Sequence, residues 1–138
     1  MPNICQVSLK GNMSIIKENM KNFNKFYEKN YFYIIVPNKD QNFFKKKIKK
    51  KNEKKISENS IIKFSNFKKI SNKYLKHTKY YKKIQNRLKW YYQQVLKISF
   101  LIDFIENKNE NMVIWDADTI LIKKLNFCQN NFSYYYGT

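Results

Sequence analysis

YFYIIV at residues 31–36 and MVIW at residues 112–115 are the two runs that decide the fold class. Both are short and continuously apolar; Pro37 and Asn38 stop the first, and the second runs directly into Asp116. Continuous apolar runs of this length are typical of strands buried on both faces, as strands are in parallel sheets. We therefore predict that both runs are strands of one mainly parallel sheet.

The stretches around these runs alternate between strand and helix patterns. ICQVSL at residues 4–9 and SIIKF at residues 60–64 are short and β-compatible. Apolar residues recur at helical spacing in residues 15–27, 43–48 and 82–105. In the last of these helices the expected buried stripe consists of Leu88, Tyr91 or Tyr92, Val95, Ile98 and Ile102. Residues 65–81 fit neither pattern, and we expect an irregular surface excursion there.

This alternation predicts βαβ units, and hence an α/β fold with a mainly parallel sheet flanked by helices. The 138 residues suit one domain, contain only two Gly and two Pro, and show no internal repeat. We therefore expect a single domain over residues 1–138. Ligands of such sheets bind beyond the carboxyl ends of the strands, where Asp116 and Asp118 would lie.

The formal net charge of +18 raises the question of a polyanionic partner. Arg87 is the single Arg among 28 basic residues, so the other 27 are Lys. Recognition of bases and phosphates usually draws on the bidentate guanidinium fork, which this chain barely provides. The composition therefore disfavours nucleic acid as a partner. It leaves a solvated lysine-rich surface or a peripheral contact with an anionic membrane as interpretations.

Cysteine usage and the N-terminus bear on the compartment. Cys5 and Cys128 fit neither a metal-ligand spacing nor a disulfide framework, which indicates free thiols in a reducing compartment. MPNICQVSLKGN has no apolar segment behind a basic start, and no stretch reaches about 18 uninterrupted apolar residues. We therefore expect a cytoplasmic protein whose membrane contact, if any, is peripheral at the inner face.

Two carboxylates spaced by one residue follow the second apolar run, in Asp116-Ala117-Asp118. Hard divalent cations prefer oxygen ligands, and such a cation can hold a diphosphate and ease its departure from a sugar. Acidic pairs are also common as solvated turns, so the buried strand before the motif carries most of its signal. The motif predicts a metal and diphosphate site.

A second signal lies in RLKWYYQQVLK at residues 87–97. Its polar and aromatic residues at spacing i, i+3, i+4 and i+7 share one helix face, and they are Trp90, Gln93, Gln94 and Lys97. Two interpretations remain open from periodicity alone. The face either belongs to a ligand site, or it is an ordinary helix surface on which Trp90 reaches the core.

Together, RLKWYYQQVLK and MVIWDADTIL resemble a group of largely uncharacterised bacterial glycosyltransferases of the GT-A type. Members of that group pair a W-Y-x-Q-Q-x-x-K helix with a strand ending in D-A-D-T, and the specific part of the resemblance covers residues 87–127. It implies a GT-A-like, Rossmann-like fold. It also implies metal-dependent transfer of a sugar from a nucleotide-sugar donor to a glycan or lipid-linked acceptor.

The resemblance also implies roles for individual residues. Asp118 would be the main ligand of Mn²⁺ or Mg²⁺, and Asp116 would contact the ribose, the metal or its water shell. Four residues of the preceding helix would bind the substrate or support the motif, namely Lys97, Gln94, Gln93 and Arg87. GT-A domains of this type continue past Asp-X-Asp with the acceptor site, whereas this chain ends at Thr138. We therefore expect the N-terminal part of a longer enzyme, with its sheet incomplete at the C-terminus and no transferase activity by itself.

Two other classes stay open. Phosphatases of the haloacid-dehalogenase type also carry Asp-X-Asp after an apolar strand, but usually near the N-terminus. They have Thr or Val two residues after the second Asp, where this chain has Ile120. A basic nucleic-acid-binding module is supported by the charge and by tyrosines such as Tyr80 and Tyr81 that could stack on bases. No recognisable nucleic-acid-binding motif frames those tyrosines.

Overall fold

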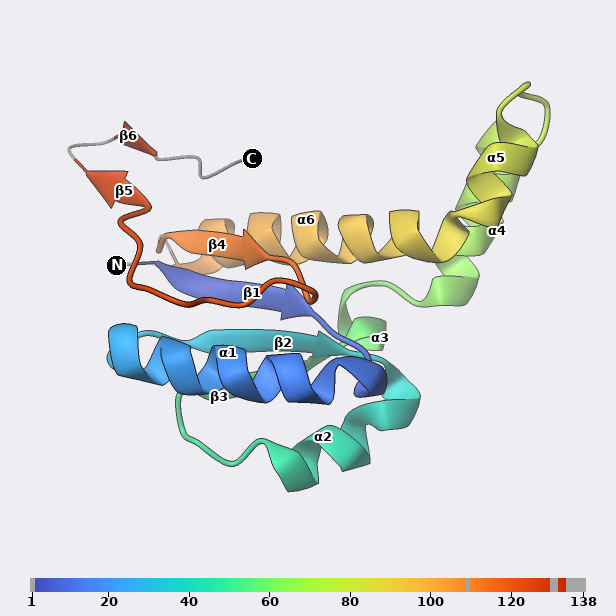
Figure 1. Cartoon of the computed structure of the whole chain (residues 1–138). Coiled ribbons are helices and arrows are strands. Elements are labelled where there is room, and N and C mark those ends of the chain that lie inside the picture. Colours follow the sequence, from blue (N-terminus) through green and yellow to red (C-terminus); the bar gives the residue numbers. More distant parts are fainter. Residues whose placement is uncertain (1, 109, 130–131, 134–138) are drawn as a thin grey trace.

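A four-stranded parallel sheet forms the centre of the computed structural model, which describes residues 2–108, 110–129 and 132–133 (Figure 1). Its strands are β1 (Asn3–Val7), β2 (Phe32–Val36), β3 (Glu53–Ser57) and β4 (Met112–Trp115). They are arranged in the order β3-β2-β1-β4, and every pairing is parallel. The α/β class predicted from the two apolar runs is therefore confirmed, and the fold is Rossmann-like.

Helices cover both faces of this sheet. One face carries α1 (Met13–Phe26) and α2 (Gln41–Lys47), and the other carries α6 (Leu88–Lys108). The remaining helical segments are η1 (Lys10–Asn12), η2 (Asn38–Asp40), α3 (Glu58–Ile61), α4 (Phe64–Leu75) and α5 (Tyr81–Asn86). Near the C-terminus, β5 (Cys128–Gln129) and β6 (Phe132–Ser133) form an antiparallel pair. Figure 1 shows α4 and α5 standing away from the sheet at one end of α6.

The two-residue period of the strands divides the core into two layers. Ile4 and Ile34 point to the α1 side, where the fully buried Phe23 packs edge-on against Phe32 at 5.2 Å between ring centroids. Cys5 and the alternate residues of β1 and β2 point to the α6 side. There they meet four residues of α6, which are Tyr92, Leu96, Phe100 and Phe104. Each large side chain buried this way contributes about 1.5–3 kcal/mol, so both layers are needed to hold the sheet.

The third strand lies at β3 and not at residues 60–64, so that prediction was wrong. Among the described residues β3 pairs only with β2, and an edge strand tolerates charged side chains because one side of it faces water. Lys54 and Lys55 are exposed, whereas the buried Glu53 accepts a hydrogen bond from Asn24 Nδ2 at 3.0 Å. The SIIKF run instead spans the end of α3 and the start of α4, and its apolar side chains pack against the α6 layer.

Residues 65–81 were expected to be irregular, and this prediction was also wrong, because α4 occupies most of them. In α6 the expected buried stripe was placed partly on the wrong side. Ile98 and Ile102 are 56% and 52% exposed, while Leu96 and Phe100 face the sheet. Trp90 is 52% exposed, so the interpretation that places it in the core is wrong as well. The cause is that α6 carries apolar residues on two sides, and periodicity does not say which side meets the sheet.

The path of the chain creates one special position in the sheet. From β1 the chain moves outward through β2 to β3, then crosses through α6 to reach β4 on the other side of β1. The direction of strand order therefore reverses between β1 and β4, which is a topological switch point. Ligands of open α/β sheets bind in the crevice at that point.

Candidate functional site

Two loops meet at the switch point, one after β1 and one after β4. The register pairs Gln6 with Trp115, so Asp116 follows the last paired residue of β4. The residues after β1 continue through Ser8 and Leu9 into η1 and then α1. The Asp-X-Asp motif therefore lies at the carboxyl edge of the sheet, beside the loop that connects β1 to α1.

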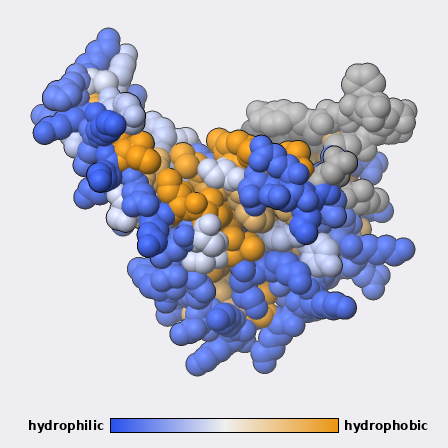
Figure 2. All heavy atoms as spheres, turned by 180° about the vertical axis from the view of Figure 1, so that it is seen from behind, coloured by the Kyte–Doolittle hydropathy of each residue, from blue (hydrophilic) through white to orange (hydrophobic). Residues whose placement is uncertain are grey.

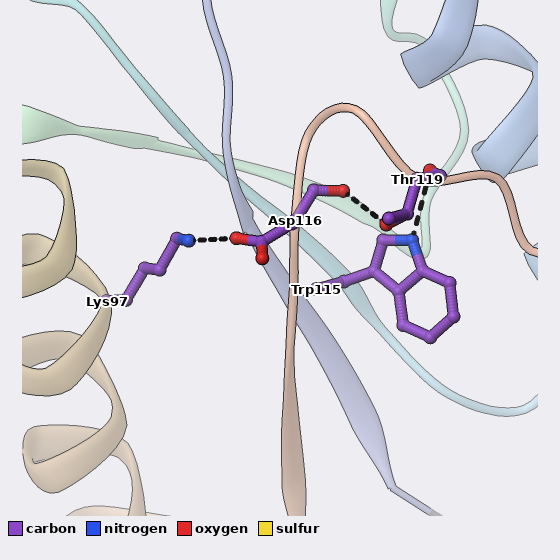
Figure 3. Close-up of polar contacts among 4 residues, drawn as sticks. All are labelled: Lys97, Trp115, Asp116 and Thr119. Atoms are coloured by element: carbon purple, nitrogen blue, oxygen red, sulfur yellow. Dashed lines mark hydrogen bonds and ion pairs between the residues drawn. The ribbon is translucent and has the colours of Figure 1, made fainter. Parts of the chain in front are cut away.

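Hydrogen bonds within the Asp-X-Asp loop and from α1 fix its conformation, and Figure 3 shows those among Trp115, Asp116 and Thr119. Thr119 Oγ1 donates to the carbonyl of Asp116 at 2.8 Å, and Trp115 Nε1 donates to the carbonyl of Thr119 at 3.2 Å. Asn19, fully buried in α1, donates to the same Thr119 carbonyl at 2.8 Å and accepts from the Leu121 amide at 2.8 Å. These contacts fix the turn and leave the carboxylate of Asp118 exposed.

Lys97 lies in α6, on the opposite face of the sheet from Asn19, and its side chain contacts Asp116. Its Nζ donates to Asp116 Oδ1 as a charge-assisted hydrogen bond, and Figure 3 shows the two side chains extended toward each other from α6 and the end of β4. The Lys97 side chain is only 8% exposed, whereas that of Asp116 is 65% exposed. A buried cation thus orients a carboxylate whose remaining surface faces solvent.

A cavity of about 420 Å³ opens along the same carboxyl edge, on the α6 side of the sheet. Its lining comes from the ends of β1 and β2, from α3 and from the first half of α6, and comprises Val7, Leu9, Ile35, Pro37, Lys39, Glu58, Phe64, Lys89, Tyr92, Gln93 and Leu96. Burial raises the pKa of the Glu58 carboxyl and Asp40 raises it further, while the Asn38 backbone and Lys39 act in the opposite direction. Apolar walls with a few charged groups suit a flat, partly polar ligand.

Two polar side chains at the end of β1 are buried without a hydrogen-bond partner among the described residues. They are Gln6, which is fully buried, and Ser8, which is 1% exposed. Buried polar groups are almost always hydrogen-bonded, so unpaired ones call for an explanation such as a functional role or a bound molecule. Gln6 lies in β1 and Ser8 directly follows it, so both border the switch point.

The structure brings together some of the residues expected at the site and separates others. Lys97 contacts Asp116, and Gln93, one turn before Lys97, lines the cavity. Gln94 instead lines a groove between α4, α5 and α6. Arg87 is exposed just before α6, where it lies beside Lys68 and Trp90 along a further surface cavity.

Asn19, Gln6 and Ser8 were not identified from the sequence. Asn19 did carry a readable signal, because it is a polar residue inside the apolar stripe of α1, between Ile16 and Met20. Such a residue needs buried partners, and the Asp-X-Asp loop supplies them. Gln6 in β1 and Ser8 just after it lie in a stretch of sequence that gives no comparable sign.

The described residues contain no group of three or more His, Cys, Asp or Glu side chains that could hold a metal ion. The two carboxylates at the switch point are those of Asp116 and Asp118. Mg²⁺ is usually bound by one or two carboxylates together with substrate phosphates, and not by a complete protein cage. The pair therefore fits a cation that arrives with a diphosphate, with the exposed Asp118 as the carboxylate free to bind it.

No helix in the described part of the chain is long and apolar enough to cross a membrane. Comparison with curated proteins and with solved structures gave no match. A model of DUF6492, a family of unknown function, matches residues 7–129, which include most of the sheet, α6 and the Asp-X-Asp loop. The chain belongs to the DUF6492 family.

Proposed function

We propose that this domain binds the diphosphate of a nucleotide-sugar together with Mn²⁺ or Mg²⁺, as the donor-binding part of a glycosyltransferase. The observation that carries the proposal is the position of Asp116 and Asp118 at the switch point of a Rossmann-like sheet, whose carboxyl edge also holds a cavity of about 420 Å³ at the ends of β1 and β2. The resemblance of the motif and its helix to GT-A-type enzymes supports the same assignment. Transfer of the sugar to a glycan or lipid-linked acceptor is part of the proposal, and no catalytic residue is assigned.

The donor would lie along the carboxyl edge of the sheet. The cavity accepts the nucleoside between the ends of β1 and β2 and the first half of α6, with Lys39 and Lys89 on its walls. The diphosphate then extends toward the Asp-X-Asp loop. A divalent cation bound there supplies positive charge for the phosphate oxygens. Ala117 between the two carboxylates has a small side chain, which leaves room for the diphosphate.

Lys97 and Asp118 have different tasks in this arrangement. Lys97 holds Asp116 in one orientation and supplies a buried positive charge beneath the loop. Asp118 is exposed and is free to bind the cation directly. Because Lys97 already satisfies one oxygen of Asp116, loss of the Asp118 carboxylate should weaken metal-dependent binding more than loss of the Asp116 carboxylate.

Isothermal calorimetry with nucleoside diphosphates, with and without MnCl₂, tests the proposal. We expect nucleotide binding to require the metal. Asp118→Asn should lower the affinity by more than about tenfold, because it removes one charge-assisted contact of about 1.5–3 kcal/mol. Glu106→Gln is the matched control, because Glu106 is an exposed carboxylate on α6. Equal affinity with and without metal, or an equal loss in Asp118→Asn and the control, would refute metal-assisted donor binding.

A further inference from the structure

A strongly basic helical arm projects from the domain. The arm consists of residues 63–89, which include α4 and α5. It carries nine Lys and one Arg, all of them exposed, and no Asp or Glu. Its charge of +10 leaves 18 − 10 = +8 for the other 111 residues, so more than half of the net charge sits in about a fifth of the chain.

Hydrogen bonds connect α4 and α5 of the arm, and an apolar groove lies between these helices and α6. Asn72 Oδ1 accepts hydrogen bonds from Tyr81 Oη and Gln85 Nε2, both at 3.1 Å, which ties α5 to α4. Between these helices and α6 lies a groove of about 440 Å³. Its lining is almost entirely apolar and comprises Phe67, Ile70, Ser71, Tyr74, Leu75, Ile84, Tyr91, Gln94, Val95 and Ile98.

Large apolar and aromatic side chains on and beside the arm are exposed to an unusual degree. Ile70 is 50% exposed and Tyr74 is 67% exposed, while Ile98, across the groove on α6, is 56% exposed. Tyr80 and Trp90 are 55% and 52% exposed. Figure 2 shows hydrophobic residues gathered where the arm joins the body, bordered by hydrophilic residues along the arm. An exposed apolar patch rimmed by polar residues marks an interaction site.

We propose that the arm docks the protein on an anionic phospholipid bilayer. Lysines near such a surface gain electrostatic attraction from its negative potential. Tyr and Trp side chains are favoured at the level of the lipid head groups, and aliphatic side chains insert below them. The arm supplies all three kinds of side chain around one apolar groove. An anionic lipid surface is the partner that matches both the positive charge of the arm and its exposed apolar side chains.

Nucleic acid would match the charge and could stack on the exposed tyrosines, but it would not match the exposed aliphatic side chains of the arm. A polyanion in water offers little for exposed Ile70 and Ile98 to bury against, whereas a bilayer does. Phosphate recognition also favours Arg, and Arg87 is the only one in the chain. Figure 1 further shows that the arm leaves the body at the end of α6 where β1, β2 and β4 have their carboxyl ends. Docking would therefore place that edge of the sheet near the membrane. The inference does not depend on nucleotide binding.

Co-sedimentation with vesicles tests the proposal without nucleotide or metal. We would compare pure phosphatidylcholine vesicles with vesicles that also contain phosphatidylglycerol, at about 150 mM salt. The test variant replaces Lys68, Lys69 and Lys73 of α4 with Gln. The matched control replaces Lys45, Lys46 and Lys47 of α2 with Gln, which removes the same charge from an equally exposed helix. Circular dichroism confirms that both variants fold.

We expect binding to the anionic vesicles only, with a partition coefficient at least about tenfold lower in the α4 variant, since each Lys contributes a factor of several. The α2 control should lose less. Trp fluorescence should shift to the blue on binding, and Trp90→Phe should abolish the shift while Trp115 remains. Equal losses in the two lysine variants, an unchanged emission spectrum, or binding to single-stranded RNA in place of vesicles would each overturn the proposal.

Discussion

Replacement of Asp116 by Asn should destabilise the protein because it leaves Lys97 without its anionic partner. The Lys97 side chain is 8% exposed and that of Asp116 is 65% exposed. Two unit charges about 3 Å apart attract by about 5.5 kcal/mol at an effective dielectric constant of about 20 and by about 1.4 kcal/mol in water. Since solvent reaches Asp116, the lower part of that range applies. We expect Asp116→Asn to lower the free energy of unfolding by about 2 kcal/mol.

Removal of the Lys97 charge, in contrast, should have little effect on stability. Lys97→Met deletes the charge together with its desolvation cost and fills the space with a side chain of similar length, so it should change stability by less than about 1 kcal/mol. The double variant Asp116→Asn with Lys97→Met should therefore be more stable than Asp116→Asn alone.

Urea denaturation of the four proteins gives the coupling free energy of the pair. Asp118→Asn is the internal control, because Asp118 is exposed two residues away and should cost less than about 0.5 kcal/mol. Equal effects of Asp116→Asn and Asp118→Asn, with no recovery in the double variant, would refute the idea that Asp116 compensates a buried lysine.

Three further predictions concern the two faces of the sheet. Asn19→Ala should lower the free energy of unfolding by about 2–3 kcal/mol in thermal or urea denaturation, because the Thr119 carbonyl and the Leu121 amide lose their hydrogen-bond partner. An unchanged free energy would mean that water replaces Asn19. Gln6→Met should raise the free energy of unfolding by about 1 kcal/mol, since the buried amide lacks partners; destabilisation would show that Gln6 is satisfied. Burial raises the pKa of both Cys5 and Tyr92 to about 12, with Lys97 opposing the first shift and Glu58 adding to the second. The protonated forms are therefore favoured in the native state, so stability present below pH 9.0, the ordinary pKa of the thiol, should fall as the pH rises toward 12. A slope that stays unchanged in Cys5→Ala with Tyr92→Phe would contradict this.

Two strands could be located from sequence because their residues form continuous apolar runs; the prediction that such runs are buried on both faces holds for β2 but is wrong for β4, which is a half-buried edge strand. β2 and β4 lie within the apolar runs at residues 31–36 and 112–115, and α1 lies where its apolar spacing predicted a helix. The other edge strand, β3, could not be predicted, since its sequence EKKIS is mostly polar and resembles a loop, whereas β4 is apolar throughout. Lys-rich sequence likewise concealed α4, whose contacts to α5 and α6 supply the order that its composition does not indicate. Residues 82–105 were predicted as one helix, and the structure divides them into α5 and α6 at Arg87.

The candidate site shows the same division. The motif position was readable, because an apolar strand running straight into two carboxylates is a local pattern. The contact between Lys97 and Asp116 was only suggested, since it depends on which face of α6 meets the sheet. Helical periodicity placed Gln94 on the same face as Lys97, yet Gln94 lines the groove on the α4 side. A helix with apolar residues on two sides has no unique orientation until tertiary contacts select one.

Paramagnetic broadening by Mn²⁺ would show whether a cation binds at the Asp-X-Asp loop, because it locates the cation in a folded protein of 17.0 kDa. Amide resonances would be recorded with substoichiometric Mn²⁺, in the presence and absence of a nucleoside diphosphate. We expect that the nucleotide makes broadening appear at residues 116–119 and at the loop after β1, and that Asp118→Asn removes it. Broadening that does not need the nucleotide, or that centres on Glu106 and Glu110 near the opposite end of the sheet, would contradict donor binding at the Asp-X-Asp loop.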